Sequence, residues 1–208
     1  MSKATLQPAL QRRPLVKKIL EGADDDLLVL AGLGSANWDI TNAGDRSLNM
    51  PLWGAMGATV AMGLGLALAQ PAKRVLVITG DGDMLMGMGS LATVAVQQPD
   101  NLAICVLDNE KFGETGNQAT HTSPRNNGPT ESGAGTDLSL IAKGCGIADT
   151  GVVRVEAEVP TLVKDLRTRK GPVFRVVKVM VEKLDFVMPP QDGAYLKDRF
   201  REALLGRP

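Results

Sequence analysis

Two short segments of this 208-residue chain carry residue types that suit a hard metal ion. Asp81 follows the apolar run 75–78, and Asn109, 28 residues further on, follows the apolar run 104–107. Short runs rich in β-branched residues are typical of buried parallel strands, so both side chains are expected just beyond the carboxyl ends of strands. Ligands bind at that edge of a parallel sheet. Carboxylate and amide oxygens suit Mg²⁺, which usually takes phosphate oxygens as well.

The residues around Asp81 suit a phosphate group. Gly80 and Gly82 allow the backbone to approach a phosphate closely, because neither has a side chain. A helix is expected from residue 85, and the N–H groups at its start would point toward an anion. The alternative is that Asp81 and Asn109 are ordinary turn residues, a position in which Asp and Asn are common.

Three motifs in a fixed order make the chain resemble a known family. Gly80-Asp81-Gly82 followed by Asp108-Asn109 resembles the cofactor motif of thiamine diphosphate enzymes, which is Gly-Asp-Gly and then usually Asn-Asn. Upstream, Trp53-Gly54-Ala55-Met56-Gly57 resembles the segment that surrounds the aminopyrimidine ring in 2-oxo acid decarboxylases. Downstream, residues 112–120 resemble the Thr-Gly-Gly-Gln stretch of sulfopyruvate and phosphonopyruvate decarboxylases. The resemblance covers roughly residues 25–180.

This resemblance implies that the chain binds thiamine diphosphate and Mg²⁺. Asp81, Asn109 and the backbone carbonyl of Lys111 would hold the metal. Met56 would support the two cofactor rings in a bent arrangement, and the Gly54 carbonyl would accept a hydrogen bond from the aminopyrimidine. The cofactor-binding residues that the resemblance implies are Trp53, Gly54, Ala55, Met56, Gly80, Asp81, Gly82, Asp83, Asn109, Lys111, Phe112, Gly113 and Glu114.

Asp83 and Asp108 depart from the usual family pattern. The family usually has Ser, Ala or Gly in place of Asp83, and a carboxylate beside a diphosphate is unfavourable. Asp83 is therefore expected to turn away and cap the following helix. Asp108 replaces the commoner first Asn and is expected to support the loop without binding the metal. Lys111, His121 and Arg125 are the local cations that could meet an acidic substrate group.

Strands and helices that would position these residues alternate along the chain. Strands are expected at 27–31, 74–79, 102–107, 152–155 and 172–181, and helices at 14–21, 57–70, 85–97, 137–143, 158–169 and 193–205. Residues 36–52 and 110–136 are expected to be irregular. The alternation predicts an α/β fold with three layers, in which a mostly parallel sheet has helices on both faces. The chain is expected to form one diphosphate-type domain, residues 1–208, with a core at about 25–182 and a helical tail at 184–208.

Composition excludes several classes of function. The chain has 23 Lys and Arg residues against 23 Asp and Glu residues, so no basic surface for nucleic acid is predicted. The longest apolar stretch, residues 55–69, contains three glycines and is too short to span a bilayer. Two cysteines and an N-terminus without an apolar signal core favour a cytoplasmic location.

The catalytic glutamate is expected on another chain. The resemblance implies that catalysis needs a carboxylate near the aminopyrimidine, supplied in this family by a separate pyrimidine-binding domain. This chain is too short for both domains. It is therefore expected to be the β-type subunit of a two-chain 2-oxo acid decarboxylase, a carboxy-lyase that is inactive without a pyrimidine-binding α subunit. The assembly would be a homodimer or a higher hetero-oligomer, with the small-residue helix 57–70 near the interface.

Other interpretations remain open. The β subunit of a thiamine-dependent 2-oxo acid:ferredoxin oxidoreductase shares much of the Thr-Gly-x-Gln pattern, but such proteins usually carry cluster-binding cysteines, for which two are too few. A Rossmann dehydrogenase is disfavoured because Gly32-Leu33-Gly34 lacks the third glycine and the later acidic residue. A thiamine diphosphate-binding subunit that has lost turnover is also compatible with the unusual Asp83, Asp108 and Asn117.

Overall fold

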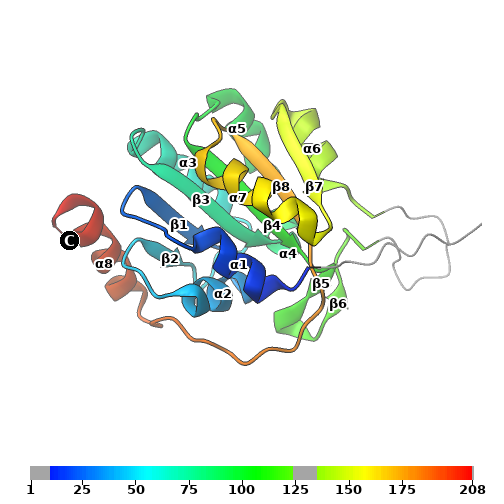
Figure 1. Cartoon of the computed structure of the whole chain (residues 1–208), viewed down its shortest axis with the longest axis horizontal. Coiled ribbons are helices and arrows are strands. Elements are labelled where there is room, and N and C mark those ends of the chain that lie inside the picture. Colours follow the sequence, from blue (N-terminus) through cyan, green and yellow to red (C-terminus); the bar gives the residue numbers. More distant parts are fainter. Residues whose placement is uncertain (1–9, 124–134, 208) are drawn as a thin grey trace, which may run out of the picture.

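A six-stranded, wholly parallel sheet forms the centre of the molecule (Figure 1). The computed structural model describes residues 10–123 and 135–207. In the order β2-β1-β3-β4-β8-β7 the strands are β2 (Asn49–Pro51), β1 (Leu27–Ala31), β3 (Arg74–Gly80), β4 (Leu102–Asp108), β8 (Val173–Lys178) and β7 (Asp149–Val153). Every residue of β1 and β4 is buried, as expected for parallel strands that are covered on both faces.

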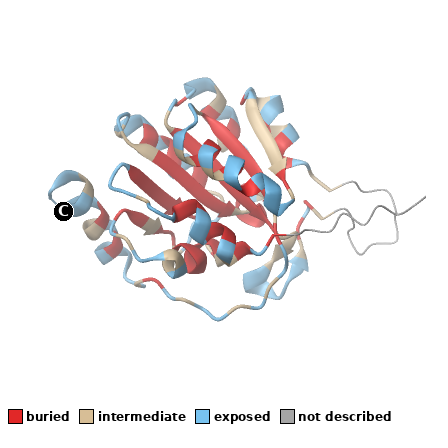
Figure 2. Cartoon of the chain, in the orientation of Figure 1, coloured by how far each residue is buried: buried red, intermediate tan, exposed pale blue. Residues whose placement is uncertain are grey.

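Helices pack on both faces of the sheet, so the molecule has three layers (Figure 2). One face is covered by α1 (Arg12–Leu20), α2 (Ser35–Ala43) and α7 (Val159–Thr168). The other is covered by α3 (Thr59–Ala69), α4 (Asp81–Met86), α5 (Ser90–Gln97), α6 (Leu138–Cys145) and α8 (Gly193–Leu205). Successive residues of a strand point to opposite faces of the sheet. In β3, Leu76 and Ile78 pack in the core beneath α1, α2 and α7, whereas Val75 and Val77 pack in the core on the other face. The predicted three-layer α/β fold is confirmed.

The order of the strands reverses between β1 and β3. From β1 the chain passes through α2 to β2 on one side, and then returns through α3 to β3 on the other side of β1. The loops that leave β1 and β3 therefore diverge at the carboxyl edge of the sheet. In parallel sheets such a switch point opens a crevice in which ligands bind.

The prediction that residues 36–52 are irregular is wrong. This segment contains α2 and the edge strand β2. Asn37, Trp38 and Asp39 favour helices weakly, but packing overrides propensity here, because Ala36 and Ile40 reach the core and the Asn37 side chain donates to Leu52 O at 2.6 Å.

The prediction of a single helix at 85–97 is also wrong. α4 begins earlier, at Asp81, and ends at Met86, and α5 begins at Ser90. The break lies at Gly87, whose backbone touches that of Gly57. A Cβ on Gly87 would lie 2.2 Å from Gly57 O, so the two segments approach more closely than any side chain would allow.

The other boundaries agree more closely with the sequence. α8 spans the predicted residues, and Asp137 caps α6 by accepting from Leu140 N at 3.0 Å. The predicted loop 110–136 contains a hairpin, β5 (Lys111–Phe112) and β6 (Gln118–Ala119), joined through the 3₁₀ turn η1 (Gly113–Thr115). A second 3₁₀ turn, η2 (Glu156–Glu158), precedes α7. The part of the predicted loop at 124–134 lies outside the described residues.

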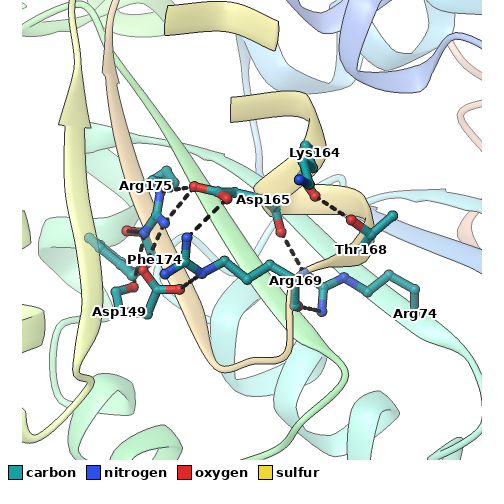
Figure 3. Close-up of polar contacts among 8 residues, drawn as sticks. All are labelled: Arg74, Asp149, Lys164, Asp165, Thr168, Arg169, Phe174 and Arg175. Carbon is teal, nitrogen blue, oxygen red and sulfur yellow. Dashed lines mark hydrogen bonds and ion pairs between the residues drawn. The ribbon is translucent and has the colours of Figure 1, made fainter. Parts of the chain in front are cut away.

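A cluster of charged side chains joins α7 to β7 and β8 (Figure 3). Arg175, which is buried, donates from Nη2 to Asp165 and Asp149, each at 2.7 Å. Arg169 pairs with Asp149 at 2.5 Å and with Asp165 at 3.2 Å. Burial alone would raise the pKa of Asp165, but hydrogen bonds and charge from Arg175 and Arg169 outweigh it and hold that pKa below its ordinary value.

After β8 an extended segment runs around the molecule to α8, which packs on the edge strand β2 (Figure 1). Leu196 and Phe200 of α8 are buried, and Arg199 forms a two-pronged ion pair with Asp45 at 2.7 and 3.0 Å. Among residues 10–123 and 135–207, no helix is both long and apolar enough to cross a membrane.

Candidate functional site

A cleft lies at the switch point, on the carboxyl edge of the sheet. We call it the switch-point cleft, and it holds about 630 Å³ of space that is open to solvent. Its walls come from the loop after β1, the start of α4, the end of β4, the β5–β6 hairpin, and two side chains from elsewhere, Arg12 and Met56. The lining residues are Arg12, Leu33, Gly34, Ser35, Ala36, Met56, Gly80, Asp81, Gly82, Asp83, Leu107, Asn109, Lys111, Phe112, Gly113, Glu114 and Thr115.

Asp81 is a buried carboxylate at the floor of this cleft. It is 1 % exposed, and the hydroxyls of Thr120 and Thr122 both donate to its Oδ2 atom, at 2.5 and 3.1 Å. Burial, reinforced by the nearby charge of Asp108, raises the pKa of Asp81 to about 6, against the stabilising effect of the two hydroxyls. A carboxylate whose negative charge is disfavoured in this way suits a site that receives a cation.

Asn109 enters the cleft from the next strand, β4. Its Oδ1 atom accepts from the backbone N–H of Lys111 at 3.0 Å, which closes an Asx turn and fixes Asn109 relative to Lys111. Glu110, between them, has a φ of 61°, a backbone conformation that L residues rarely adopt. Strained residues of this kind often lie at functional sites.

Asp108 supports this loop, as predicted. Its carboxylate accepts from Glu110 N at 3.1 Å, lies 2.8 Å from the Thr122 hydroxyl, whose single hydrogen it shares with Asp81, and pairs with Lys178 at 2.6 Å. Burial would lower the pKa of Lys178, but its contacts with Asp108 and Glu110 outweigh burial and raise that pKa. Asp108 is therefore bonded away from the cleft, which it does not line.

Gly82 lies where two apolar side chains of the cleft meet. A Cβ on Gly82 would lie 2.5 Å from the Phe112 ring and 3.6 Å from the Met56 methyl group. The absence of a side chain at Gly82 thus lets Phe112 lie directly on the backbone at the start of α4. Further along the hairpin, Glu114 approaches Gly34 in the loop after β1. A Cβ on Gly34 would lie 3.5 Å from Glu114 Oε1.

The first part of the predicted motif at 53–57 lies beside the cleft and does not line it. Trp53 donates from Nε1 to Pro190 O at 2.8 Å, and its ring packs on that of Trp38 at a centroid distance of 5.5 Å. Gly54 and Ala55 follow on the loop that leads to Met56, and Met56 reaches the cleft.

The prediction that Asp83 caps a helix is wrong. α4 begins at Asp81 with Gly80 at its N-cap, so Asp83 lies inside the first turn. Its carboxylate is 2 % exposed and accepts from Gly57 N at 2.5 Å and from the Thr79 hydroxyl.

Sequence reasoning missed Arg12, which lines the cleft from the start of α1. Its guanidinium is buried beside Asp39 at 3.0 Å, and its backbone N–H donates to Glu182 at 2.8 Å. No motif near Arg12 indicated this position, since α1 joins the site only through its packing against α2. Of the other predicted cations, Lys111 lines the cleft, His121 is exposed, and Arg125 lies outside the described residues.

Comparison with known proteins agrees with this geometry. Residues 34–177 match the family described as thiamine pyrophosphate enzyme, C-terminal TPP binding domain. The sulfopyruvate decarboxylase subunit beta of Methanocaldococcus jannaschii is 33% identical over 196 residues, which cover 93% of this chain and 97% of that protein. The sulfopyruvate decarboxylase of Methanosarcina acetivorans is 33% identical over 204 residues, which cover 98% of this chain but 50% of that protein.

A solved structure shows the same fold at a lower level of sequence similarity. The 2-oxoglutarate:ferredoxin oxidoreductase of Magnetococcus marinus superposes with a TM-score of 0.67 at 17% identity, covering 96% of this chain and 79% of that chain. Asp81 and Asn109 meet at the switch-point cleft, and the family match spans β3, β4 and the β5–β6 hairpin, which supply much of its lining. The chain therefore belongs to the thiamine pyrophosphate enzymes, as a domain of their C-terminal, cofactor-binding type.

Proposed function

We propose that this chain is the β-type subunit of a two-chain, thiamine diphosphate-dependent decarboxylase of a 2-oxo acid such as sulfopyruvate or phosphonopyruvate. The observation that carries the proposal is the meeting of Asp81 and Asn109, 28 residues apart in sequence, in one cleft at the switch point of the sheet. The close relationship to sulfopyruvate decarboxylase beta subunits over nearly their whole length supports the same reaction class.

The donor set fits Mg²⁺ bound to a diphosphate. Asp81 supplies a carboxylate, of which Oδ1 is the oxygen that the two threonines do not engage. Asn109 supplies an amide oxygen, and the Asx turn holds the Lys111 carbonyl next to it. In the described part of the chain no three His, Cys, Asp or Glu side chains form a metal cluster, so phosphate oxygens would complete the shell. A bound cation would also offset the repulsion between Asp81 and Asp108.

The remaining lining residues would bind and orient the cofactor. Gly80 and Gly82 line the cleft without side chains, so a diphosphate could approach their backbone there, and Phe112, which lies against Gly82, would cover it. Met56 would support the rings, and the hairpin residues Gly113 and Glu114 would form the outer wall. When bound, thiamine diphosphate supplies an electron sink for the carbon that CO₂ leaves. The chain's own contribution is to hold that cofactor in shape and to limit the access of water.

A partner chain is needed for the pyrimidine end and for the catalytic glutamate. Two observations support this part of the proposal. The Methanosarcina relative is about twice as long as the region that this chain matches, which leaves room there for a second domain. In this chain the outer side of α3 is apolar, with Met62 43% and Leu68 50% exposed beside Ala61, Gly65 and Ala69. A helix that is apolar on all sides is normally buried, so the exposed side of α3 is a suitable surface for the partner.

Thermal unfolding tests the cofactor site. A ligand that binds only the folded state raises the unfolding temperature, so we expect a rise that needs thiamine diphosphate and Mg²⁺ together. The Asp81→Asn variant, which keeps the shape of the side chain, should lose that rise. Asp137→Asn, which alters the N-cap of α6 and does not line the switch-point cleft, is the matched control and should keep it.

The same titration is then run on the complex with a co-expressed pyrimidine-binding subunit, together with an assay for CO₂ release. Decarboxylation that depends on both chains would support the proposal in full. A complex that binds the cofactor and Mg²⁺ but releases no CO₂ from any 2-oxo acid would favour a non-catalytic subunit instead. Absence of any cofactor effect on the complex would overturn the proposed site.

A further inference from the structure

We propose that Asp83 is a positioning residue that holds the turn carrying Met56 against the switch-point cleft. The inference rests on the proposed function, because it concerns how the chain shapes the cofactor pocket. It assigns a purpose to the carboxylate that stands where related sequences usually have Ser, Ala or Gly.

Both carboxylate oxygens of Asp83 accept hydrogen bonds that hold this turn. Oδ1 accepts from the backbone N–H of Gly57 at 2.5 Å, and Oδ2 accepts from the hydroxyl of Thr79 at the end of β3. The carboxylate is 2 % exposed, so these bonds form away from bulk water, where they are strong and costly to lose. Asp83 thereby links the central strand β3 to the loop that leads into α3.

The segment that Asp83 holds is a tight turn with an unfavourable backbone. Ala58 N donates to Ala55 O at 2.9 Å, which encloses Met56 and Gly57 in a four-residue turn. Gly57 has a φ of 92°, as the third residue of a type II turn requires, and Ala55 has a φ of 56°. A non-glycine residue in that region is strained and persists only where its surroundings hold it. The bond from Gly57 to Asp83 is such a restraint, one residue from Met56.

Close packing also restricts the position of the turn formed by residues 55–58. The Gly57 backbone lies against Met86 and Gly87 at the end of α4, where a Cβ on Gly57 would be 3.0 Å from Met86 C. On the other side, a Cβ on Gly32 would lie 2.8 Å from Asp83 Oδ2 and 2.6 Å from the Thr79 hydroxyl. The carboxylate thus fills a space that Gly32 leaves open, between the loop after β1 and the turn. Met56 projects from this turn into the cleft, where its methyl group meets Gly82.

The first test is amide hydrogen exchange of Gly57 in the full-length chain without cofactor. We expect the Gly57 N–H to be protected in the wild type and to exchange at least tenfold faster in Asp83→Ala. Asp83→Asn should be intermediate, because its amide oxygen still accepts from Gly57. Met56→Ala should leave the protection of Gly57 unchanged, since the bond to Asp83 does not involve that side chain.

The second test is turnover in the complex with the pyrimidine-binding subunit, at saturating thiamine diphosphate and Mg²⁺. Asp83→Ala should lower kcat about 10- to 100-fold, the scale of a misplaced catalytic contact, while the cofactor Kd changes by less than about threefold. Met56→Ala should show the same loss, and the double variant should lose no more than either single one, because both changes remove the same contact. Asp165→Asn, a buried aspartate on α7, is the control for general destabilisation and should lower the unfolding temperature without lowering kcat.

Unchanged Gly57 exchange in Asp83→Ala would overturn the proposal. So would losses in Asp83→Ala and Met56→Ala that simply multiply in the double variant. The exchange experiment needs no turnover, so it separates this inference from the proposed function. Faster Gly57 exchange in Asp83→Ala, found together with a wild-type complex that cannot decarboxylate, would contradict the reaction and leave the positioning contact standing.

Discussion

At the scale of single residues, Asp81 is the group on which the proposed metal site depends. Its burial and the charge of Asp108 disfavour the ionised form, yet a metal ligand must be ionised. At the proposed site, the affinity for Mg²⁺ would therefore be coupled to the protonation of this one carboxyl.

We expect the effect of Mg²⁺ and thiamine diphosphate on the unfolding temperature to grow as the pH rises from 5 to 7. The pKa of Asp81 is raised from 3.8 to about 6, so below pH 6 the metal must displace a proton. Calorimetry in two buffers of different ionisation enthalpy should show net proton release at pH 5.5. Asp81→Asn has no proton to release, and proton release of the same size in that variant would contradict the assignment.

In the chain without metal, the titration of Asp81 changes stability with pH in the opposite direction. A carboxyl whose pKa is raised in the folded state favours folding fully below the unfolded value of 3.8, and that contribution is lost as the pH rises through about 6. Titration of Asp81 alone thus makes the metal-free chain less stable near neutral pH, where metal binding is strongest.

At the scale of elements, the ion cluster in Figure 3 fixes α7 against the strands at the far edge of the sheet. Arg175 lies between Asp165 and Asp149 and also donates to Asp149 O and Phe174 O, each at 3.1 Å. Removing it leaves the buried Asp165 and the half-buried Asp149 with the exposed Arg169 as their cationic partner.

We expect Arg175→Met to lower the free energy of unfolding by about 3–5 kcal/mol, the usual result when one member of a buried ion pair is removed. Arg169→Met is the matched control. The Arg169 side chain is 53% exposed, so its loss should cost about 1 kcal/mol or less. Urea unfolding of both variants measures the difference, and equal losses would show that burial does not decide the strength of this cluster.

Element by element, the sequence indicated the central strands β1, β3 and β4 well and missed the edge strand β2 and the β5–β6 hairpin. Continuous apolar runs such as 75–78 and 104–107 have few alternatives to a buried strand. α2 was missed because its helix depends on long-range contacts, including the pairs that Arg12 and Arg13 form with Asp39. The break between α4 and α5 depends on the touching backbones of Gly57 and Gly87, which no local pattern encodes.

The candidate site was predictable where the motif itself supplies the lining. Asp81, Asn109, Lys111 and Phe112 follow strand ends directly, so sheet topology brings them together. The partners of Asp83 and the position of Arg12 come from packing between distant segments and could not be read from spacing.

At the scale of the whole molecule, the apolar outer side of α3 is the exposed surface that we assign to the proposed partner. The replacement Met62→Glu together with Leu68→Glu should prevent co-purification with the pyrimidine-binding subunit, because buried unpaired charges are costly at an interface. Both side chains are exposed, so the unfolding temperature of the chain should change little. Leu140→Glu on α6, at a residue that is 65% exposed, is the matched control and should leave the complex intact. A complex that survives the double replacement would place the partner elsewhere.

The switch-point cleft depends on the pairing of two strands that are far apart in the sequence, β1 and β3. Its opposing walls follow β1 and β3, and α2, β2 and α3 all lie between those strands in the chain. β1 must therefore pair with β3 before there is a pocket to fill. A cofactor and metal that bound only after this pairing could not accelerate it, and they would act on the finished sheet by slowing its unfolding. Cofactor bound in this way would lengthen the lifetime of the folded chain without helping a new chain to reach that state.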